Sequence, residues 1–491
     1  MNPVPDIRIQ KVNNKNVNSE GKFILYWMIS NRRLKWNYSL DRALEWAMEL
    51  NKPLVVLEAL DCDYEWACDR FHGFIIEGMR ENYSEAKNKN ILYYPYIEPA
   101  PGKGSGLVQT ISKYACLIVT DDYPAFFIPG MLKKISEKIP ILLEKVDSNG
   151  LLPTDASQRE FTTAYSFRRF LQKTLPLYIF DHPRKSSVEG LRLKKIKKLP
   201  DEITKKWPAA SPEFLENYPI EIKKMPIDHK VKIITRIGGA GTGSNLLELF
   251  INKKLQSYIE KRNYPEESAT SNLSPHLHFG HISTHEIFYR IQNSEGWHPG
   301  KLSEKTNGKK EGWWGMSKSA EAFLDQLITW RELGFNMCRY NRDYDKYESL
   351  PGWAKETLYV HEMDERDHFY TLNEFENART HDPLWNAAQV QLVKEGKIHN
   401  YLRMLWGKKI LEWSQTPGEA LKAMIQLNNK YALDGRDPNS YSGIFWILGR
   451  YDRAWGPERD IFGKVRFMSS KNTRRKIRVG EYIKEYSSID S

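Results

Sequence analysis

The chain has 491 residues, which is enough for two or three domains with a sizeable core. Its 73 Lys and Arg against 62 Asp and Glu give a formal charge of +11, which suits an anionic partner such as nucleic acid without establishing one. The four cysteines show no zinc spacing, and no signal peptide or membrane-spanning apolar run is present, so we expect a soluble, intracellular protein that binds no metal.

Residues 1–20 carry no periodic pattern, and we expect a flexible N-terminal arm there. Strand-like and helix-like segments then alternate through residues 21–150. The predicted strands are 22–29, 53–60, 93–97, 116–120 and 140–146, and the predicted helices are 41–50, 71–83 and 105–114. This alternation predicts an α/β domain built on a parallel, Rossmann-like sheet with helices on both faces.

Ligands of such sheets bind at the carboxyl ends of the strands. The polar residues that follow the first and fourth predicted strands are Ser30, Asn31, Arg32, Arg33, Asp121 and Asp122. No Walker or GxGxxG pattern occupies these turns, so the sequence indicates where a ligand would bind but not which ligand.

Residues 151–235 are rich in Pro and Lys and read as an interdomain connector. The basic run at 192–208 is typical of a solvated face, with DNA contact as the alternative. Residues 236–491 are almost entirely helical in pattern and predict a large all-α domain. It opens on GGAGTGS at 238–244, whose glycine spacing does not fit a dinucleotide loop, so we interpret it as a flexible helix entry.

One helix face of this domain combines indoles with a cation. Arg403, Trp406, Ile410 and Trp413 are spaced 3, 4 and 3 residues apart, so they share a face. Two indoles predict a core face, and an arginine there needs an anion opposite it, either a carboxylate or a ligand. Core packing and a structural ion pair are the simpler explanation of this pattern.

Two further segments carry chemistry. ATSNLSPHLHFG at 269–280 places hydroxyl groups before a predicted helix start at Pro275, which suits a phosphate group or an ordinary serine cap. The histidines nearby have apolar neighbours, so no metal site is predicted there. Phe323, Leu327, Trp330 and Gly334 mark a further predicted α-helix face.

Three long motifs resemble the class II cyclobutane pyrimidine dimer photolyases of the photolyase/cryptochrome family. They are THDPLWNAAQVQLVKEGKIHNYLRMLWGKKILEW (380–413), YALDGRDPNSYSGIFW (431–446) and RFMSSKNTRRK (466–476). The resemblance is dense from about residue 236 to 476 and looser before it. It implies a carbon–carbon lyase that repairs UV-damaged DNA, using light and a reduced, anionic FAD. The sequence does not indicate an oligomeric state, and we take a monomer as the default. It also implies that the α/β domain can hold an antenna chromophore, often a deazaflavin.

The resemblance assigns roles residue by residue. It implies FAD contacts at Tyr258, Thr270, Ser271, Asn272, Leu273, Ser274, Arg403, Asn428, Asp434 and Asp437. Within that set, Arg403 pairs with Asp434 beside the isoalloxazine, and Asn428 lies next to the flavin N5. Trp406, Trp385 and Trp413 match the tryptophan chain that carries an electron from the surface to the flavin.

For the substrate, Trp330 and Trp446 match the tryptophans that line the lesion pocket. The predicted phosphate contacts are Arg450, Lys464, Arg466, Lys471, Arg474 and Arg475. The chain departs from the family at Gln326, where photolyases acting on cyclobutane dimers usually carry a glutamate. This departure leaves open a different lesion, the (6-4) photoproduct, or a cryptochrome-like light sensor. The resemblance implies a nuclear protein in a eukaryote and a cytoplasmic one in a prokaryote.

Overall fold

The computed structural model describes residues 3–488. The chain forms two compact units: unit 1 comprises Met1–Ala156, Leu175–Glu248 and Leu273–Ile291, and unit 2 comprises Ser157–Thr174, Leu249–Asn272 and Gln292–Ser491. These segments differ from the boundaries expected from sequence. Residues 157–174, expected in the connector, pack within unit 2, and residues 273–291, expected in the helical domain, pack within unit 1.

Unit 1 is built on a six-stranded sheet with the strand order β1-β6-β5-β2-β3-β4. Its strands are β1 (Ile9–Lys11), β2 (Phe23–Met28), β3 (Leu54–Leu60), β4 (Ile91–Ile97), β5 (Ala115–Asp121) and β6 (Leu143–Val146). Strands β2 to β6 pair in parallel, as the sequence predicts, and their order is that of a doubly wound fold. The sheet as a whole is mixed, because β1 pairs antiparallel with β6.

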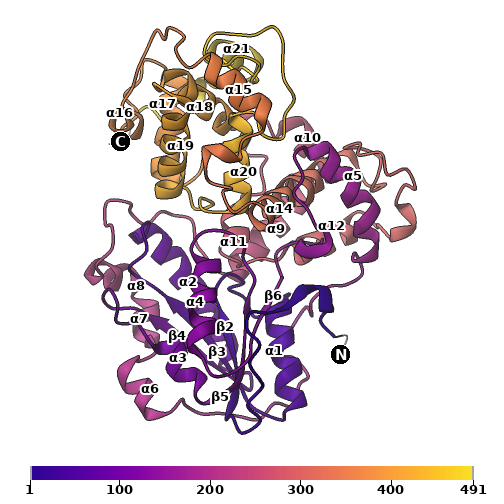
Figure 1. The fold of residues 1–491 in the computed structure, drawn as a ribbon, viewed down its shortest axis with the longest axis vertical. Coiled ribbons are helices and arrows are strands. Elements are labelled where there is room, and N and C mark those ends of the chain that lie inside the picture. Colours follow the sequence, from indigo (N-terminus) through magenta and orange to yellow (C-terminus); the bar gives the residue numbers. More distant parts are fainter. Residues whose placement is uncertain (1–2, 489–491) are drawn as a thin grey trace. The chain divides into compact units, whose positions relative to one another are not determined.

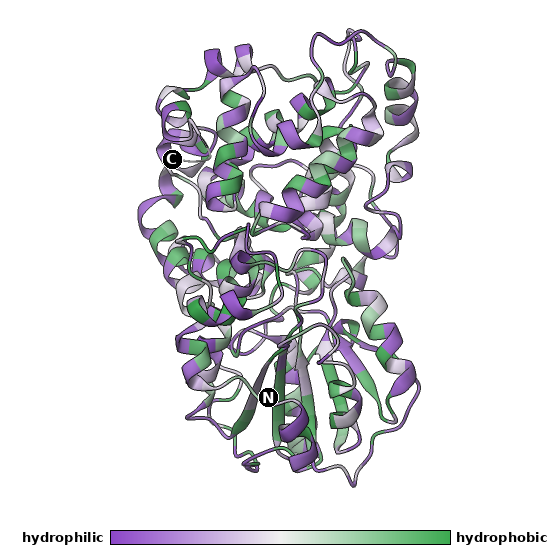
Figure 2. Ribbon diagram, turned by 90° about the vertical axis from the view of Figure 1, so that its left-hand side faces the viewer, coloured by the Kyte–Doolittle hydropathy of each residue, from purple (hydrophilic) through white to green (hydrophobic). Residues whose placement is uncertain are grey.

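The central strands form because their sequences are continuously apolar. All six residues of β2 and all seven of β5 are buried, as expected for strands covered on both faces. Figure 2 shows the sheet largely in the colours of hydrophobic residues. Helix α1 (Tyr38–Glu49) begins at Asn37, whose side chain accepts hydrogen bonds from the amides of Ser39 and Leu40.

The predicted flexible arm is wrong for residues 6–11. The guanidinium of Arg8 is buried, donates to the carbonyl oxygens of Gly150 and Leu151 and lies 3.7 Å from the Asp147 carboxylate. Ile9–Lys11 then adds an edge strand. A three-residue strand with the sequence IQK has no period that sequence reasoning could detect. Residues 1–2 of the expected arm lie outside the described part.

Helices cover both faces of the sheet. Helix α1 and the end of α2 share one hydrophobic cluster with β2, β3 and β5, and α3 packs against β5 and α4 (Figure 1). The helices of unit 1 after α1 are α2 (Asp69–Ala86), α3 (Leu107–Ser112), α4 (Ile128–Lys138), α6 (Asp201–Lys206), α7 (Pro212–Glu216), α8 (Tyr218–Glu221) and α11 (Ser274–His278). Helices α9 (Ala240–Lys253) and α12 (Thr284–Ser294) each continue from unit 1 into unit 2.

Within the described residues, every named element of unit 2 is helical. The α-helices wholly within it are α5 (Ala164–Thr174), α10 (Tyr258–Lys261), α13 (Lys318–Leu324), α14 (Arg331–Tyr340), α15 (Gly352–Val360), α16 (Leu372–Glu376), α17 (Pro383–Glu395), α18 (Asn400–Trp413), α19 (Pro417–Tyr431), α20 (Pro438–Ile447), α21 (Ser470–Lys476) and α22 (Gly480–Glu485). Between residues 3 and 488, no helix is long and apolar enough to cross a membrane.

Helix α20 is held by two close backbone approaches. A Cβ on Gly334 of α14 would lie 2.6 Å from the carbonyl oxygen of Pro438, at the start of α20. A Cβ on Gly407 of α18 would collide with the side chain of Ile447, at its end. Helix α20 therefore packs closely against α14 at its start and against α18 at its end.

Candidate cofactor and nucleic-acid site

The anion that the sequence requires opposite Arg403 is a carboxylate. Arg403 Nη2 lies 2.9 Å from Asp434 Oδ1, and both side chains are largely buried, with 17% and 14% exposed. Arg403 Nε is buried and has no hydrogen-bond partner within the described residues. A polar ligand beside this pair would satisfy that orphaned donor.

Asn428 and Asp437 flank the loop that carries Asp434. Asn428 lies near the end of α19, is 2% exposed and donates from Nδ2 to Ser440 Oγ at 2.6 Å. Asp437 caps α20 by accepting a hydrogen bond from the amide of Asn439 at 2.9 Å. The loop thus brings an amide and two carboxylates next to the end of α19, and Asp437 has a structural role as a helix cap.

The three tryptophans of the predicted chain lie next to one another. The rings of Trp385 and Trp406 are nearly parallel at 6.5 Å between centroids, and Trp385 and Trp413 are 6.0 Å apart and steeply inclined. Hydrogen bonds fix the series: Trp406 Nε1 donates to Gln389 Oε1, and Trp385 Nε1 donates to the carbonyl oxygen of Trp406, each at 2.9 Å. Trp385, supplied by α17, therefore lies between two indoles of α18.

Trp413 is not itself at the surface, because only 3% of it is exposed. Tyr370 and the exposed His381 pack against its ring, at 5.6 and 5.0 Å between centroids. Sequence reasoning missed both residues. The tyrosine precedes the motif by ten residues, and neither side chain continues a helical period.

Gln326 and Trp330 lie on a π-helical segment, Asp325–Trp330, between α13 and α14. Sequence spacing predicted an uninterrupted α-helix there, but the wider turn interrupts it. Asp325 within the segment is anchored by Arg168 of α5, with Nε 2.8 Å from Oδ1. Such π-turns are frequent at functional sites, and both Gln326 and Trp330 are partly exposed.

Trp446, in the last turn of α20, is surrounded by cations. The guanidinium carbon of Arg466 lies 5.5 Å from its ring centroid and 4.0 Å from that of Trp455. Lys408 Nζ lies 5.2 Å from the Trp446 centroid. Basic side chains among aromatics are the arrangement expected of a nucleic-acid groove.

The predicted phosphate contacts differ in how exposed they are and in whether a carboxylate already binds them. Arg450 is an exception to the prediction, because it is 4% exposed and engaged by Glu160 and the carbonyl oxygen of Ser349. Arg466 bonds Asp452 at 2.7 Å and Lys464 lies 3.1 Å from Glu458, yet both remain partly exposed. The basic residues of α21 are exposed; they are Lys471, Arg474, Arg475 and Lys476.

The predicted diphosphate segment, Thr270 to Ser274, is a loop that runs into α11. Helix α11 has only five residues and begins at Ser274, with Leu273 at its N-cap and no side-chain cap hydrogen bond. Thr270, Ser271 and Asn272 are partly exposed, and Asn272 has a φ of 58°. Tyr258 is buried at the start of α10, with its ring 5.5 Å from that of Phe323, and burial raises its pKa.

The polar residues at the carboxyl end of the sheet bond one another. One Asp121 oxygen accepts from the backbone amides of Ile29, Ser30 and Asn31 at 2.8, 2.8 and 3.0 Å. Arg32 Nε lies 3.3 Å from Glu58, and Asp122 pairs with Lys145 at 2.9 Å. These side chains hold the turns in place and give no separate indication of an antenna ligand.

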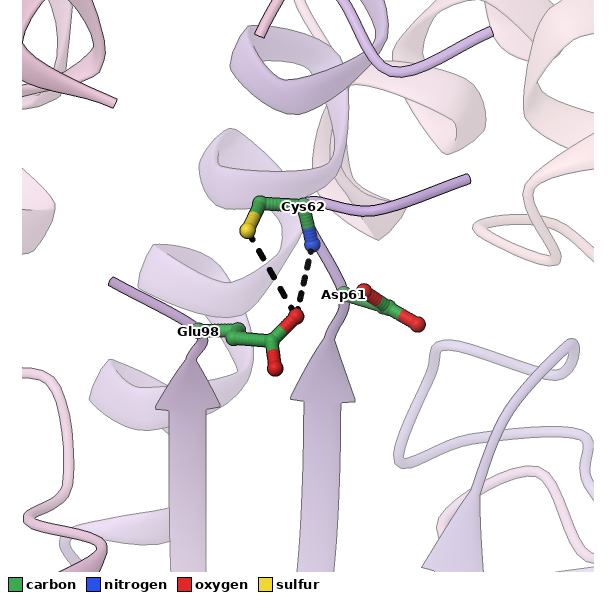
Figure 3. Close-up of side chains that lie close together, drawn as sticks. All are labelled: Asp61, Cys62 and Glu98. Carbon is green, nitrogen blue, oxygen red and sulfur yellow. Dashed lines mark hydrogen bonds between the residues drawn. The ribbon is translucent and has the colours of Figure 1, made fainter. Parts of the chain in front are cut away.

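One group among the described residues has the composition of a metal site, and it is not the histidine-rich segment. Asp61, Cys62 and Glu98 lie at the ends of β3 and β4 with their ligand atoms within 4.8 Å of one another (Figure 3). The Glu98 carboxylate already accepts hydrogen bonds from the amides of Cys62 and Gly104. Burial and Glu98 raise the pKa of Cys62 to about 12 and that of Asp61 to about 6, so the cluster is explained by shared protons and backbone amides.

Comparison with known proteins identifies the architecture and then the family. No protein-family model matches the chain. The crystal structure of a class III photolyase from Agrobacterium tumefaciens aligns with a TM-score of 0.66 over 96% of this chain and 87% of its own, at 16% identity. A sheet-based unit and a helical unit thus define a photolyase-type fold.

Sequence relatives extend this assignment. The deoxyribodipyrimidine photo-lyase of Methanothermobacter thermautotrophicus is 34% identical over 480 residues, 97% of each chain. That of Potorous tridactylus is 31% identical over 97% of this chain and 83% of its own. The chain belongs to the deoxyribodipyrimidine photo-lyase family and is an enzyme of that lyase class.

Proposed function

We propose that this protein repairs cyclobutane pyrimidine dimers in DNA, driven by light, with a reduced and anionic FAD bound in unit 2. The observation that carries the proposal is the Arg403–Asp434 pair, one turn of α18 before Trp406 and its two indole neighbours. Family membership supports the DNA-repair chemistry, and the motifs of unit 2 support the class II assignment.

The residues present fit a flavin. Arg403 carries a fixed cation that favours an anionic ring system, and its Nε is a buried donor without a partner among the described residues. Asn428 offers an amide that can donate or accept a hydrogen bond. Tyr258, Thr270, Ser271 and Asn272 would hold the remainder of the cofactor from unit 2, and Leu273 and Ser274 stay sequence predictions. When bound, reduced FAD supplies the light-driven electron.

The protein's share is positioning. Trp330 and Trp446 would receive the dimer after it leaves the duplex, a step that costs less for a damaged base pair. Gln326 would hydrogen-bond a base edge without contributing a charge. Trp406, Trp385 and Trp413 would pass electrons inward to maintain the reduced cofactor, because neighbouring indoles at these separations suit electron hopping.

The deciding experiment is repair of an oligonucleotide with one cyclobutane thymine dimer by reduced protein, under blue light and in darkness. We expect repair only under light. If a flavin-containing protein that photoreduces repairs nothing, the same assay with a (6-4) photoproduct follows. Gln326 is the observation that favours this second candidate.

A further inference from the structure

Lys408 is buried without a salt-bridge partner among the described residues. It lies on α18, two residues after Trp406, and none of its surface is exposed. Its Nζ donates to the carbonyl oxygen of Ile447, and within residues 3–488 it forms no ion pair with a carboxylate. Sequence reasoning passed over it, because nothing in the sequence distinguishes Lys408 from its neighbour Lys409, which pairs with Glu412.

Stability does not explain a lysine at this position. An ammonium loses its hydration on burial, and a neutral side chain of similar length would fill the same space at lower cost. Two contacts offset part of that cost: a carbonyl at the C-terminal end of α20 and the face of the Trp446 ring, 5.2 Å from Nζ. Both contacts lie in the turn that carries Trp446.

The proton on Lys408 is weakly held. Burial lowers its pKa from 10.5 to about 7, while Asp452 raises it and Arg466 lowers it. Those two charged groups, both on the loop that follows α20, bond each other at 2.7 Å. The amine therefore loses its charge within the physiological range, and with it the attraction to the indole.

We propose that Lys408 is a positioning residue of the lesion pocket: its ammonium holds Trp446 through the ring face and through the carbonyl that follows it, so that tight binding of the damaged bases requires the protonated amine. The inference rests on the proposed function, because it assumes that Trp446 receives the lesion. It adds a buried residue that would determine specificity through the position of Trp446.

The test measures, in darkness, the Kd of the flavin-loaded protein for a duplex with one thymine dimer and for the same undamaged duplex, between pH 6 and pH 9. Discrimination is the Kd for the undamaged duplex divided by the Kd for the dimer-containing duplex. This ratio cancels general electrostatic effects on DNA binding. We expect this ratio to fall about thirtyfold in the wild type as the pH rises through 7, the size of one desolvated cation–π contact. The ratio of Lys408→Met should be low and independent of pH.

Two variants make the result specific. Lys408→Arg keeps its charge throughout this range and should retain high discrimination at pH 9. Lys422→Met removes an exposed lysine from α19 and should behave as wild type. Flavin content and the rate of photoreduction, which depends on the Trp406 chain, should be unchanged in every variant.

The outcomes separate the inference from the function on which it rests. A wild-type protein with no preference for the dimer at any pH would contradict the proposed function. A clear preference that is flat with pH, or that Lys408→Met retains, would overturn the role of Lys408 alone. If Lys408→Met does not fold, the wild-type and Lys408→Arg profiles decide, because identical profiles would exclude titration of this amine.

Discussion

At the scale of single residues, Arg403 sets the electrostatics of the helical unit. It places a permanent charge on a helix face shared with two buried indoles, and Asp434 neutralises that charge at 2.9 Å. The pair ties α18 to the α19–α20 loop, and it leaves one guanidinium N–H without a partner among the described residues.

Arg403→Ala should lower the flavin content sharply, because it removes the cation and leaves a largely buried carboxylate unpaired. We expect flavin binding at least about tenfold weaker, since a charged hydrogen bond is worth about 1.5–3 kcal/mol. The measurement is the ratio of flavin to protein after purification. Arg342→Ala removes an exposed arginine of the same unit as the control. An Arg403→Ala protein that purifies with full flavin would show that the Arg403–Asp434 pair is not needed for flavin binding.

Gln326→Glu tests the position at which the resemblance implies a glutamate in photolyases that act on cyclobutane dimers. A carboxylate accepts stronger hydrogen bonds than an amide, so we expect repair of a cyclobutane dimer to improve, by about fivefold for a gain near 1 kcal/mol. The assay compares the repair rates of both proteins with dimer and (6-4) substrates. Unchanged rates on both would show that the residue does not contact the lesion.

At the scale of elements, the order of the indoles depends on two helices. Helix α18 supplies Trp406 and Trp413, and α17 inserts Trp385 between them. Trp406→Phe should therefore abolish photoreduction of the resting protein while leaving repair by chemically reduced protein intact. Flavin absorbance under illumination measures the first effect, and dimer repair measures the second. Photoreduction at the wild-type rate would rule out this route.

A second prediction concerns the stability of the packing between α14 and α20. Gly334→Ala would place a Cβ 2.6 Å from the carbonyl oxygen of Pro438 and 2.7 Å from the amide of Asn439, and backbone atoms cannot move aside cheaply. We expect a loss of about 1–3 kcal/mol of stability. Gly443→Ala, within α20, meets open space and should be neutral or stabilising by up to about 1 kcal/mol. Equal Tm values for the two variants would contradict this packing.

The elements that the sequence predicted are those with a strong local period. Strands β2 to β6 lie where apolar runs predict them, and α1, α2 and α3 lie where helical spacing predicts them, whereas α4 was not predicted. The three-residue β1 and the π-turn at Gln326 carry no such signal, because each is imposed by partners distant in sequence: β6 for β1, and Arg168 for Asp325. The same holds within the site, where motif resemblance predicts the Arg403–Asp434 pair but cannot distinguish the buried Arg450 from the exposed Arg474.

At the scale of the whole molecule, the question is which exposed residues of the excess positive charge would bind DNA. The formal charge of +11 is spread over the chain, but two clusters of exposed basic residues stand out. One is on α21 of unit 2, with Lys471, Arg474 and Arg475, and the other is on the run in unit 1 with Lys194, Lys195 and Lys197. The α21 cluster comes directly after the segment that carries Trp446 and Arg466 in the sequence, and the other cluster does not. We therefore expect the α21 cluster to contact the DNA backbone.

Salt dependence distinguishes the two clusters. Removing one cation that binds a phosphate should reduce the slope of log K against log salt by about 0.9. Replacing Lys471, Arg474 and Arg475 with alanine should therefore flatten the slope by about 2–3 for damaged duplex, while the matched triple replacement of Lys194, Lys195 and Lys197 should leave it unchanged. Equal flattening by both would mean that the unit 1 run also meets the backbone. A slope changed by neither would mean that the charge excess serves solubility, and that recognition rests on Trp330, Trp446 and Gln326.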